Sequence, residues 1–127
     1  MIVGIGIDLV EVERMRRLLD AKGDRALERM FTIGEREYAC THPEPVRQLA
    51  ARVAAKEAAF KALSGNDLAR GIGWRELEVV SRHAQAPLLV LHGRAQERVA
   101  ELAVTRVHLS LTHTEHMAAA YVIAERL

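Results

Sequence analysis

The sequence has few of the features that mark secreted, membrane-bound or nucleic-acid-binding proteins. Its one cysteine, Cys40, cannot form a disulfide within the chain, which fits a reducing compartment. A net charge of +1 lacks the basic excess of a general nucleic-acid or membrane-surface binder. No apolar run approaches the roughly 18 residues that cross a bilayer, and the apolar start has no basic leader and is interrupted by Asp8. We therefore expect a cytoplasmic protein that begins with a buried strand and binds neither nucleic acid nor membranes.

The composition suits a small folded domain. The chain has 127 residues, of which 50% are hydrophobic, and this length predicts a single domain over residues 1–127. A domain of this size buries only a modest core, so association with further copies of the chain would help to stabilise it.

Hydrophobic periodicity predicts a mixture of helices and strands. Apolar residues three or four apart predict helices over 9–20, 25–30, 46–63 and 94–102. Thr32 followed by Glu35 predicts a capping box that opens another short helix. Apolar and β-branched runs predict strands over 2–7, 77–80, 88–92, 107–113 and 117–123, with a turn around 85–87. This order predicts an α+β fold in which a largely antiparallel sheet packs on one long, alanine-rich helix.

The long helix predicted over 46–63 carries the most informative polar residues. On a helical wheel at about 100° per residue, Glu57 falls near the middle of the apolar arc, and Lys61 falls on the same face one turn later. Arg52 and Lys56 fall on the other side. A carboxylate that faces the interior is costly unless a cation or hydrogen-bond donors meet it. We therefore predict that Glu57 faces inward and needs a cation.

Two interpretations of Glu57 and Lys61 stay open on periodicity alone. The first is an ion pair at i and i+4, which contributes about 0.2–0.5 kcal/mol on an exposed helix. The second is a site in which Glu57 holds a metal ion and Lys61 holds a phosphate, since magnesium takes one or two carboxylates and lysine binds phosphate as a point charge. Asp8 is the candidate second carboxylate, although its position between a strand and a helix also suits an N-cap.

Motifs in several parts of the chain resemble those of the 4′-phosphopantetheinyl transferases. The stretch from Arg52 to Ala62, RVAAKEAAFKA, resembles the Lys-Glu-Ala-x-x-Lys signature of that superfamily. The opening from Gly4 to Val10, GIGIDLV, resembles the first motif of its holo-acyl-carrier-protein synthase branch. Further similarity lies in segments 31–35, 74–79 and 108–113. Each motif alone is weak, but they occur in the family's order and span nearly the whole chain, so their joint occurrence is specific.

The resemblance implies the transferase fold and a reaction. The serine hydroxyl of an apo-acyl carrier protein attacks the β-phosphate of coenzyme A, phosphopantetheine moves to the serine, and adenosine 3′,5′-bisphosphate leaves. By resemblance, Asp8 and Glu57 hold magnesium, with manganese as a substitute, and Lys61 faces the phosphates. These three are the implied catalytic residues. The resemblance does not identify the proton acceptor for the serine, which is either a metal-bound water or one of the carboxylates. The implied setting is fatty acid biosynthesis, and hence lipid metabolism.

The resemblance also implies a coenzyme A site built from residues that are far apart in the sequence: Arg52, Lys61, Gly65, His108 and Ser110. In the strand predicted over 107–113, His108 and Ser110 share a face with Thr112. Without the resemblance, the solvated face of an edge hairpin is the better interpretation of that polar row. At Gly65, the Gly-Thr-Gly of many relatives is replaced by Ser64-Gly65-Asn66.

The segment from residue 14 to residue 29 is basic, with six basic and three acidic side chains. Acyl carrier proteins are acidic, and complementary charge mainly raises the rate and selectivity of association. The resemblance therefore implies that a carrier protein docks here, with Arg14, Arg17 and Arg25 as its binding residues. A solvated helix face is the simpler alternative.

Two other classes of function stay open at this point. A non-catalytic module that binds coenzyme A or a carrier protein would keep Lys61 and the basic helix but would not need both Asp8 and Glu57. A purely structural oligomerisation domain would explain an exposed apolar surface but not an inward Glu57. The family forms homotrimers with active sites between subunits, and the resemblance implies that assembly here.

Overall fold

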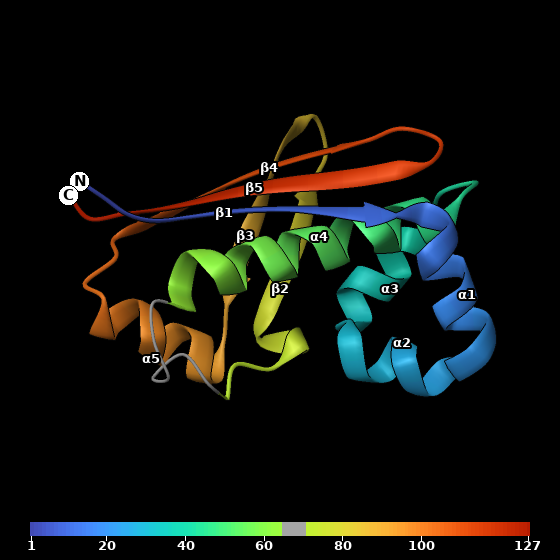
Figure 1. Ribbon diagram of the computed structural model, residues 1–127, viewed down its shortest axis with the longest axis horizontal. Helices are drawn as coiled ribbons and strands as arrows, with labels where there is room; N and C mark the ends of the chain where they lie inside the picture. Colours follow the sequence, from blue (N-terminus) through green and yellow to red (C-terminus); the bar gives the residue numbers. More distant parts are fainter. Residues whose placement is uncertain (65–70) are drawn as a thin grey trace.

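The computed structural model, which describes residues 1–64 and 71–127, places a three-stranded sheet over one long helix (Figure 1). The helices are α1 (Val12–Lys22), α2 (Asp24–Met30), α3 (Ile33–Cys40), α4 (Pro45–Ser64) and α5 (Gly93–Glu101), with a 3-10 turn η2 (Trp74–Glu76). The strands are β1 (Ile2–Glu11), β2 (Leu77–Arg82), β3 (Gln85–Leu91), β4 (Arg106–His113) and β5 (Met117–Glu125). The strand pairs within residues 1–64 and 71–127 are antiparallel, so the predicted α+β class, with an antiparallel sheet on a long helix, is confirmed.

The first and last strands of the chain lie side by side in the main sheet. The strand order there is β1-β5-β4, and β2 pairs with β3 in a separate hairpin. Helix α4 runs beneath β1 and β5, with α1, α2 and α3 gathered near one end and α5 near the other (Figure 1). The backbones of Met1 and Arg126 hydrogen-bond to each other at 2.7 and 2.8 Å. Within the described residues, no helix is both long enough and apolar enough to span a bilayer.

Strand β1 packs against the backbone of α4, and this contact depends on two glycines. Gly4 lies against the carbonyl of Ala62 and Gly6 against the carbonyl of Ala58, so closely that a Cβ atom at either glycine would collide with the carbonyl oxygen. Two residues of strand advance by about 6.6 Å and four residues of helix by about 6 Å, so the two intervals match. The strand therefore lies antiparallel to the helix. Asp8, two residues after Gly6, faces the same side of α4.

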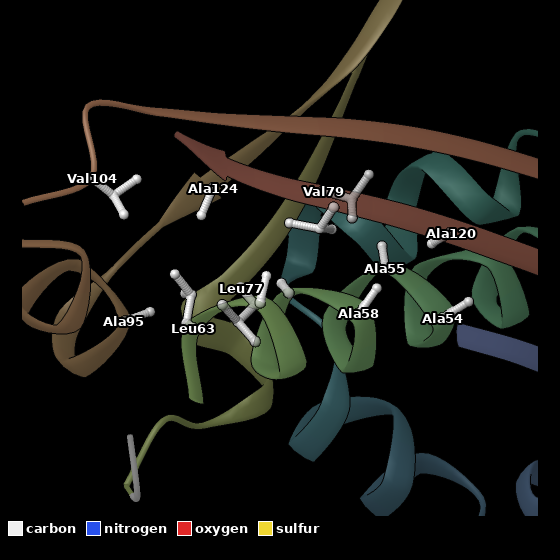
Figure 2. Close-up of a cluster of buried hydrophobic side chains, with 13 residues drawn as sticks. Ala54, Ala55, Ala58, Leu63, Leu77, Val79, Ala95, Val104, Ala120 and Ala124 are labelled. Atoms are coloured by element: carbon white, nitrogen blue, oxygen red, sulfur yellow. The ribbon is translucent and has the colours of Figure 1, made fainter. Parts of the chain in front are cut away.

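The main core lies between α4, β5, β2 and α5 (Figure 2). Alanines of α4 and of β5 belong to one buried cluster, and larger side chains such as Leu63, Leu77 and Val104 complete it. Because alanine has only a short side chain, the sheet and the helix approach each other closely. The site residues carried by β1 and α4 are thereby held on two elements that pack directly together.

Strand β1 extends further than the sequence predicts. It continues to Glu11 and α1 begins at Val12, whereas periodicity predicts a strand to residue 7 and a helix from residue 9. Strand β5 pairs with β1 as far as Glu11 opposite Met117, and this ladder overrides the local helical pattern. Asp8 therefore lies within the ladder opposite Ala120, and the N-cap of α1 is Glu11. The N-cap interpretation of Asp8 is wrong.

The turn between β2 and β3 also differs from the prediction. It consists of His83 and Ala84, with Arg82 paired to Gln85, and Ala84 has a φ of 56°. The predicted turn around 85–87 is instead the start of β3. Pro87 lies where the pairing of β2 with β3 shifts register, between Val80 and Arg82, and proline is tolerated at such an irregularity because a ladder N–H is not needed there.

Candidate active site

Helix α4 is buried on nearly every side. Between Leu49 and Leu63, only a short stripe of its side chains is exposed to solvent. In this stretch only Glu57, Phe60 and Lys61 are exposed. The prediction that Glu57 faces the interior is therefore wrong. A helix with small apolar residues all round has no single apolar arc, so a helical wheel cannot show which side is open.

The ammonium group of Lys61 connects this stripe to strand β1. Lys61 Nζ donates a hydrogen bond to the carbonyl of Ile7 at 2.9 Å and another to Asp8 Oδ1 at 3.0 Å. The Lys61 side chain is 54% exposed and that of Asp8 is 14% exposed. An exposed ion pair contributes little to stability, so exchanging this contact of Lys61 for one with an anionic ligand would cost little.

Glu57 lies beside Asp8, and the two carboxyl groups influence each other. Partial burial raises the pKa of Glu57, and a hydrogen-bonding contact with Asp8 and the negative charge of Asp8 raise it further. The positive charges of Lys61 and Arg14 act in the opposite direction. Asp8 Oδ2 is buried and has no hydrogen-bond donor among the described residues. Two carboxyl groups this close require either a shared proton or a cation between them.

This carboxylate pair offers the ligands that magnesium prefers. Magnesium is bound through one or two carboxylates and fills its other positions with water and substrate phosphates. Such a cation would bind the buried Asp8 Oδ2 and the carboxylate oxygens of the neighbouring Glu57. Across residues 1–64 and 71–127, no three or more His, Cys, Asp or Glu side chains form a metal-binding group. The pair therefore fits a cation that takes its remaining ligands from solvent and substrate.

A cleft of about 380 Å³ opens beside the exposed stripe of α4. Its walls are largely apolar, and Glu57 and Lys61 supply the exposed charges. The lining residues are Lys56, Glu57, Phe60, Lys61, Ile72, Gly73, Trp74 and Leu77. Lys61 and a cation held by Asp8 and Glu57 would bind an anionic group, and the apolar walls would contact an uncharged arm attached to it.

A second hollow of about 270 Å³ shares Glu57 and Trp74 with the cleft and also contains Arg14. Arg25 lines a neighbouring hollow, to which Trp74 also contributes. Arg14 therefore lies close to Glu57 and Trp74, and Arg25 lies close to Trp74. Arg17 is exposed on α1 and lines none of these hollows.

A buried ion pair next to the cleft was not predicted from the sequence. Lys56 and Glu35 are each 1% exposed, and Lys56 Nζ lies 2.8 Å from Glu35 Oε1. Glu35 also forms the predicted capping box with Thr32, which is confirmed. The sequence draws attention to each residue separately, as a lysine within an alanine-rich run and a glutamate at a predicted helix start, but not to their pairing.

His108 and Ser110 lie on the opposite side of the sheet from Asp8. Both are exposed on β4, where residues 107, 109 and 111 pack into the core. His108 pairs with Ile123 in the ladder, and its Nε2 lies 3.8 Å from Glu125 Oε1. The predicted alternation of β4 is confirmed, but within one chain the sheet separates these two residues from Lys61.

Arg52 lies within the interior, although it is a predicted coenzyme A ligand. It is 1% exposed, donates hydrogen bonds to Ser81 Oγ at 2.6 Å and to the carbonyl of Gln48 at 3.2 Å, and lies over the ring of Tyr38. Within one chain it does not join Asp8, Glu57 and Lys61, because it projects from another side of α4. Gly65, another predicted coenzyme A residue, lies outside the described residues.

Comparison with known proteins gives one family for the whole chain. Residues 4–124 match the model of the 4′-phosphopantetheinyl transferase superfamily. A holo-[acyl-carrier-protein] synthase of Alkalilimnicola ehrlichii is 46% identical over 126 residues, covering 98% of both chains. A holo-[acyl-carrier-protein] synthase of Solibacter usitatus is 40% identical over 125 residues, covering 98% of this chain and 99% of the relative.

Solved structures agree with this assignment. The holo-[acyl-carrier-protein] synthase of Neisseria meningitidis superposes with a TM-score of 0.87 at 30% identity, over 99% of this chain and 100% of that chain. The enzyme of Bacillus anthracis, solved in complex with CoA (3′,5′-ADP), superposes with a TM-score of 0.79 at 32% identity, over 100% and 99% of the two chains. With the two carboxylates and the lysine gathered beside a cleft, this chain belongs to the 4′-phosphopantetheinyl transferase superfamily and, within it, to the holo-[acyl-carrier-protein] synthases.

Proposed function

We infer that this protein transfers 4′-phosphopantetheine from coenzyme A to the active serine of an apo-acyl carrier protein. The reaction converts the carrier to its holo form and releases adenosine 3′,5′-bisphosphate. The observation that supports it most directly is the grouping of Asp8, Glu57 and Lys61 at one edge of a cleft, in a chain whose relatives are holo-[acyl-carrier-protein] synthases. Residues 1–127 act as one transferase domain in this proposal.

The chemistry requires the negative charge of a pyrophosphate to be neutralised while a hydroxyl approaches it. The serine oxygen bonds to the β-phosphorus, and the bond from that phosphorus to the bridging oxygen breaks. Lys61 supplies a positive charge that can hold the phosphates. The serine proton passes to solvent or to one of the two carboxylates. The arm of coenzyme A has apolar surface to contact at Phe60 and Trp74.

We propose magnesium as the metal of the reaction, with manganese as a substitute, held by Asp8 and Glu57. When bound, it neutralises phosphate charge and orients the in-line displacement. The buried Asp8 Oδ2 without a donor supports this proposal. The raised pKa of Glu57 also supports it: burial is the largest cause, and a cation between the carboxyl groups would offset the part that comes from the neighbouring Asp8.

One assay tests the proposed function. The protein is incubated with coenzyme A, magnesium and an apo-acyl carrier protein, and the carrier is weighed by mass spectrometry. The expected result is a mass gain of one phosphopantetheine group that depends on magnesium. If a transferase of established activity modifies the same carrier and this protein does not, the enzyme function is refuted and the non-catalytic binding module becomes the better interpretation.

We propose that the chain assembles as a homotrimer with active sites between subunits. The outer face of the main sheet is apolar: Ile5, Ile7, Leu9 and Tyr121 are 51%, 55%, 63% and 41% exposed. Exposed apolar patches of this kind mark interaction surfaces. His108 and Ser110 lie on the same face, so a neighbouring copy could bring its own Lys61 near them. Arg52 is not explained in this way, and its role at coenzyme A stays a prediction.

Tyr121→Asp is expected to separate the subunits and to reduce transfer, because it places a charge in the middle of this face. Light scattering should give about three times the chain mass of 14.1 kDa for the wild type and one chain mass for the variant. Ile33→Asp is the matched control, since Ile33 is an apolar residue of α3 that is 65% exposed outside the sheet. A variant that keeps the wild-type mass and activity contradicts the proposed interface.

We propose that the carrier protein docks on α1 and α2 through Arg14, Arg17 and Arg25. All three are exposed, and Arg14 lies close enough to Glu57 to affect its pKa. A carrier bound there would have its serine near the carboxylate pair. This placement supports docking over the alternative of a solvated helix face.

Charge reversal at Arg14 and Arg17 is expected to raise the KM for the carrier protein roughly tenfold, because it removes electrostatic attraction to an acidic partner. The affinity for coenzyme A should stay nearly unchanged, and both constants follow from steady-state kinetics. Arg17→Glu alone separates docking from any effect of Arg14 on Glu57. Arg82→Glu, at the exposed end of β2, is the control. An equal loss for both substrates contradicts the assignment.

We propose that the protein acts in the cytoplasm, in fatty acid biosynthesis and thus in lipid metabolism. A single cysteine that is exposed and unpaired supports a reducing compartment.

A further inference from the structure

Lys56 is a buried cation with three hydrogen bonds, and two of them hold one wall of the cleft. Its Nζ donates to Glu35 Oε1 at 2.8 Å, to the carbonyl of Trp74 at 2.9 Å and to the carbonyl of Leu77 at 2.8 Å. Trp74 and Leu77 lie at the beginning and just after the end of the short turn η2. The ammonium group therefore joins α4 to the segment that lines the cleft together with Glu57.

Glu35 supplies the charge that lets Lys56 stay in the interior. Besides Lys56, its carboxylate accepts hydrogen bonds from the backbone N–H of Thr32 at 3.0 Å and of Val79 at 2.9 Å. Burial lowers the pKa of Lys56, and the negative charge of Glu35 and its hydrogen bond oppose that change. A buried charge is retained only where partners satisfy it, and here the partners belong to α3, η2 and β2.

The segment that Lys56 holds contributes directly to the proposed site. Ile72, Gly73 and Trp74 line the cleft together with Glu57 and Lys61. Trp74 also lines the hollow that contains Arg14. Lys56 and Glu57 are consecutive, so one stretch of α4 both presents a carboxylate to the cleft and holds the segment that forms its Trp74 wall.

We propose that Lys56 is a positioning residue for phosphopantetheine transfer: by holding the carbonyls of Trp74 and Leu77, it sets the distance between the Trp74 wall and Glu57. This inference rests on the proposed function. An apolar side chain of similar length at position 56 would fill the space, but it would leave two carbonyls and the Glu35 carboxylate without their shared donor. The wall would then be free to shift, and misplacement by about 1 Å can cost as much as 10²-fold in rate.

Trp74 is the single tryptophan of the chain, so its fluorescence reports on the wall without interference. Lys56→Met is expected to raise the acrylamide quenching of Trp74 about twofold and to lower kcat/KM for coenzyme A roughly 10- to 100-fold. Lys56→Arg, which keeps a charge and donors, should recover part of both losses. The matched control is Val122→Ala, which opens the core between β5 and α4 at a side chain that is 0% exposed and should lower the melting temperature without changing the quenching.

Unchanged quenching and a kcat/KM within twofold of the wild type in Lys56→Met would overturn the proposal, as would equal changes in Val122→Ala. If Lys56→Met does not fold, Glu35→Gln decides in its place. It keeps Lys56 but removes the opposing charge, and it should change quenching and kcat/KM in the same direction. Absence of both changes would likewise overturn the proposal. A wild-type protein without transfer activity would refute the proposed function, whereas the quenching experiment would still test whether Lys56 holds Trp74.

Discussion

Asp8→Asn and Glu57→Gln should each lower phosphopantetheine transfer by roughly 10³-fold or more, because a bound metal supplies several kcal/mol of transition-state stabilisation and each 1.36 kcal/mol corresponds to tenfold in rate. Both variants should stay folded, since neither changes the shape of the side chain. Transfer is measured by the mass gain of the carrier, at saturating coenzyme A and magnesium. Glu37→Gln, an exposed amide substitution on α3, is the control. Activity within tenfold of the wild type in either variant would contradict a metal role for that carboxylate.

Glu57→Gln should also lower activity without lowering stability. The pKa of Glu57 is raised in the folded chain, so without metal its stabilising effect holds at low pH and is lost as pH rises through that pKa. Glu57→Gln removes this loss, and its melting temperature in EDTA at pH 8 should equal or exceed that of the wild type. Magnesium should stabilise the wild type and leave Glu57→Gln nearly unchanged. Equal stabilisation of both proteins would place the cation elsewhere.

Gly6→Ala is expected to lower the free energy of unfolding by about 3 kcal/mol or more, which corresponds to a loss of roughly 10 °C in melting temperature. The added methyl group would collide with the carbonyl oxygen of Ala58. A backbone carbonyl of a helix cannot turn away as a flexible side chain can. The strand must therefore move as a whole, and Asp8 would move with it.

Gly34→Ala is the matched control for this prediction. A Cβ atom at Gly34 would meet Glu78 Oε2 at 3.4 Å, which is the end of a side chain and can adjust. Gly34 is the second residue of α3, where alanine is favoured over glycine by at most about 1 kcal/mol. Thermal unfolding should thus show no loss for Gly34→Ala, and a similar loss for both variants would contradict the packing argument.

Through recognisable motifs, the family resemblance points to three residues that the structure brings together, while their roles stay predictions. Asp8, Glu57 and Lys61 are grouped in the structure as the family resemblance implies. Periodicity alone misplaces Glu57, because hydrophobicity does not show which side of an all-round apolar helix stays open. It also misses the true start of α1, since pairing with β5 is a long-range contact.

The parts that sequence reasoning cannot reach depend on distant residues. Lys56 and Glu35 are 21 positions apart, and no local rule joins a lysine in one helix to the capping residue of another. His108 and Ser110 are on the predicted face of β4, but only the folded sheet shows that this face points away from Lys61. The proposed site between subunits could not be derived from one chain's periodicity, because it would take residues from a second copy.

The matched spacing of β1 and α4 limits where this chain tolerates insertions and deletions. One residue inserted between Gly6 and Asp8 would turn Asp8 to the outer face of the sheet, because strand side chains alternate. One residue inserted between Ala58 and Lys61 would rotate Lys61 by about 100° around the helix. A length change in one element would need a compensating change in the other. Natural length variation is therefore expected in connections such as 41–44 and 83–84, where a change leaves the alignment of Gly4 and Gly6 with α4 intact.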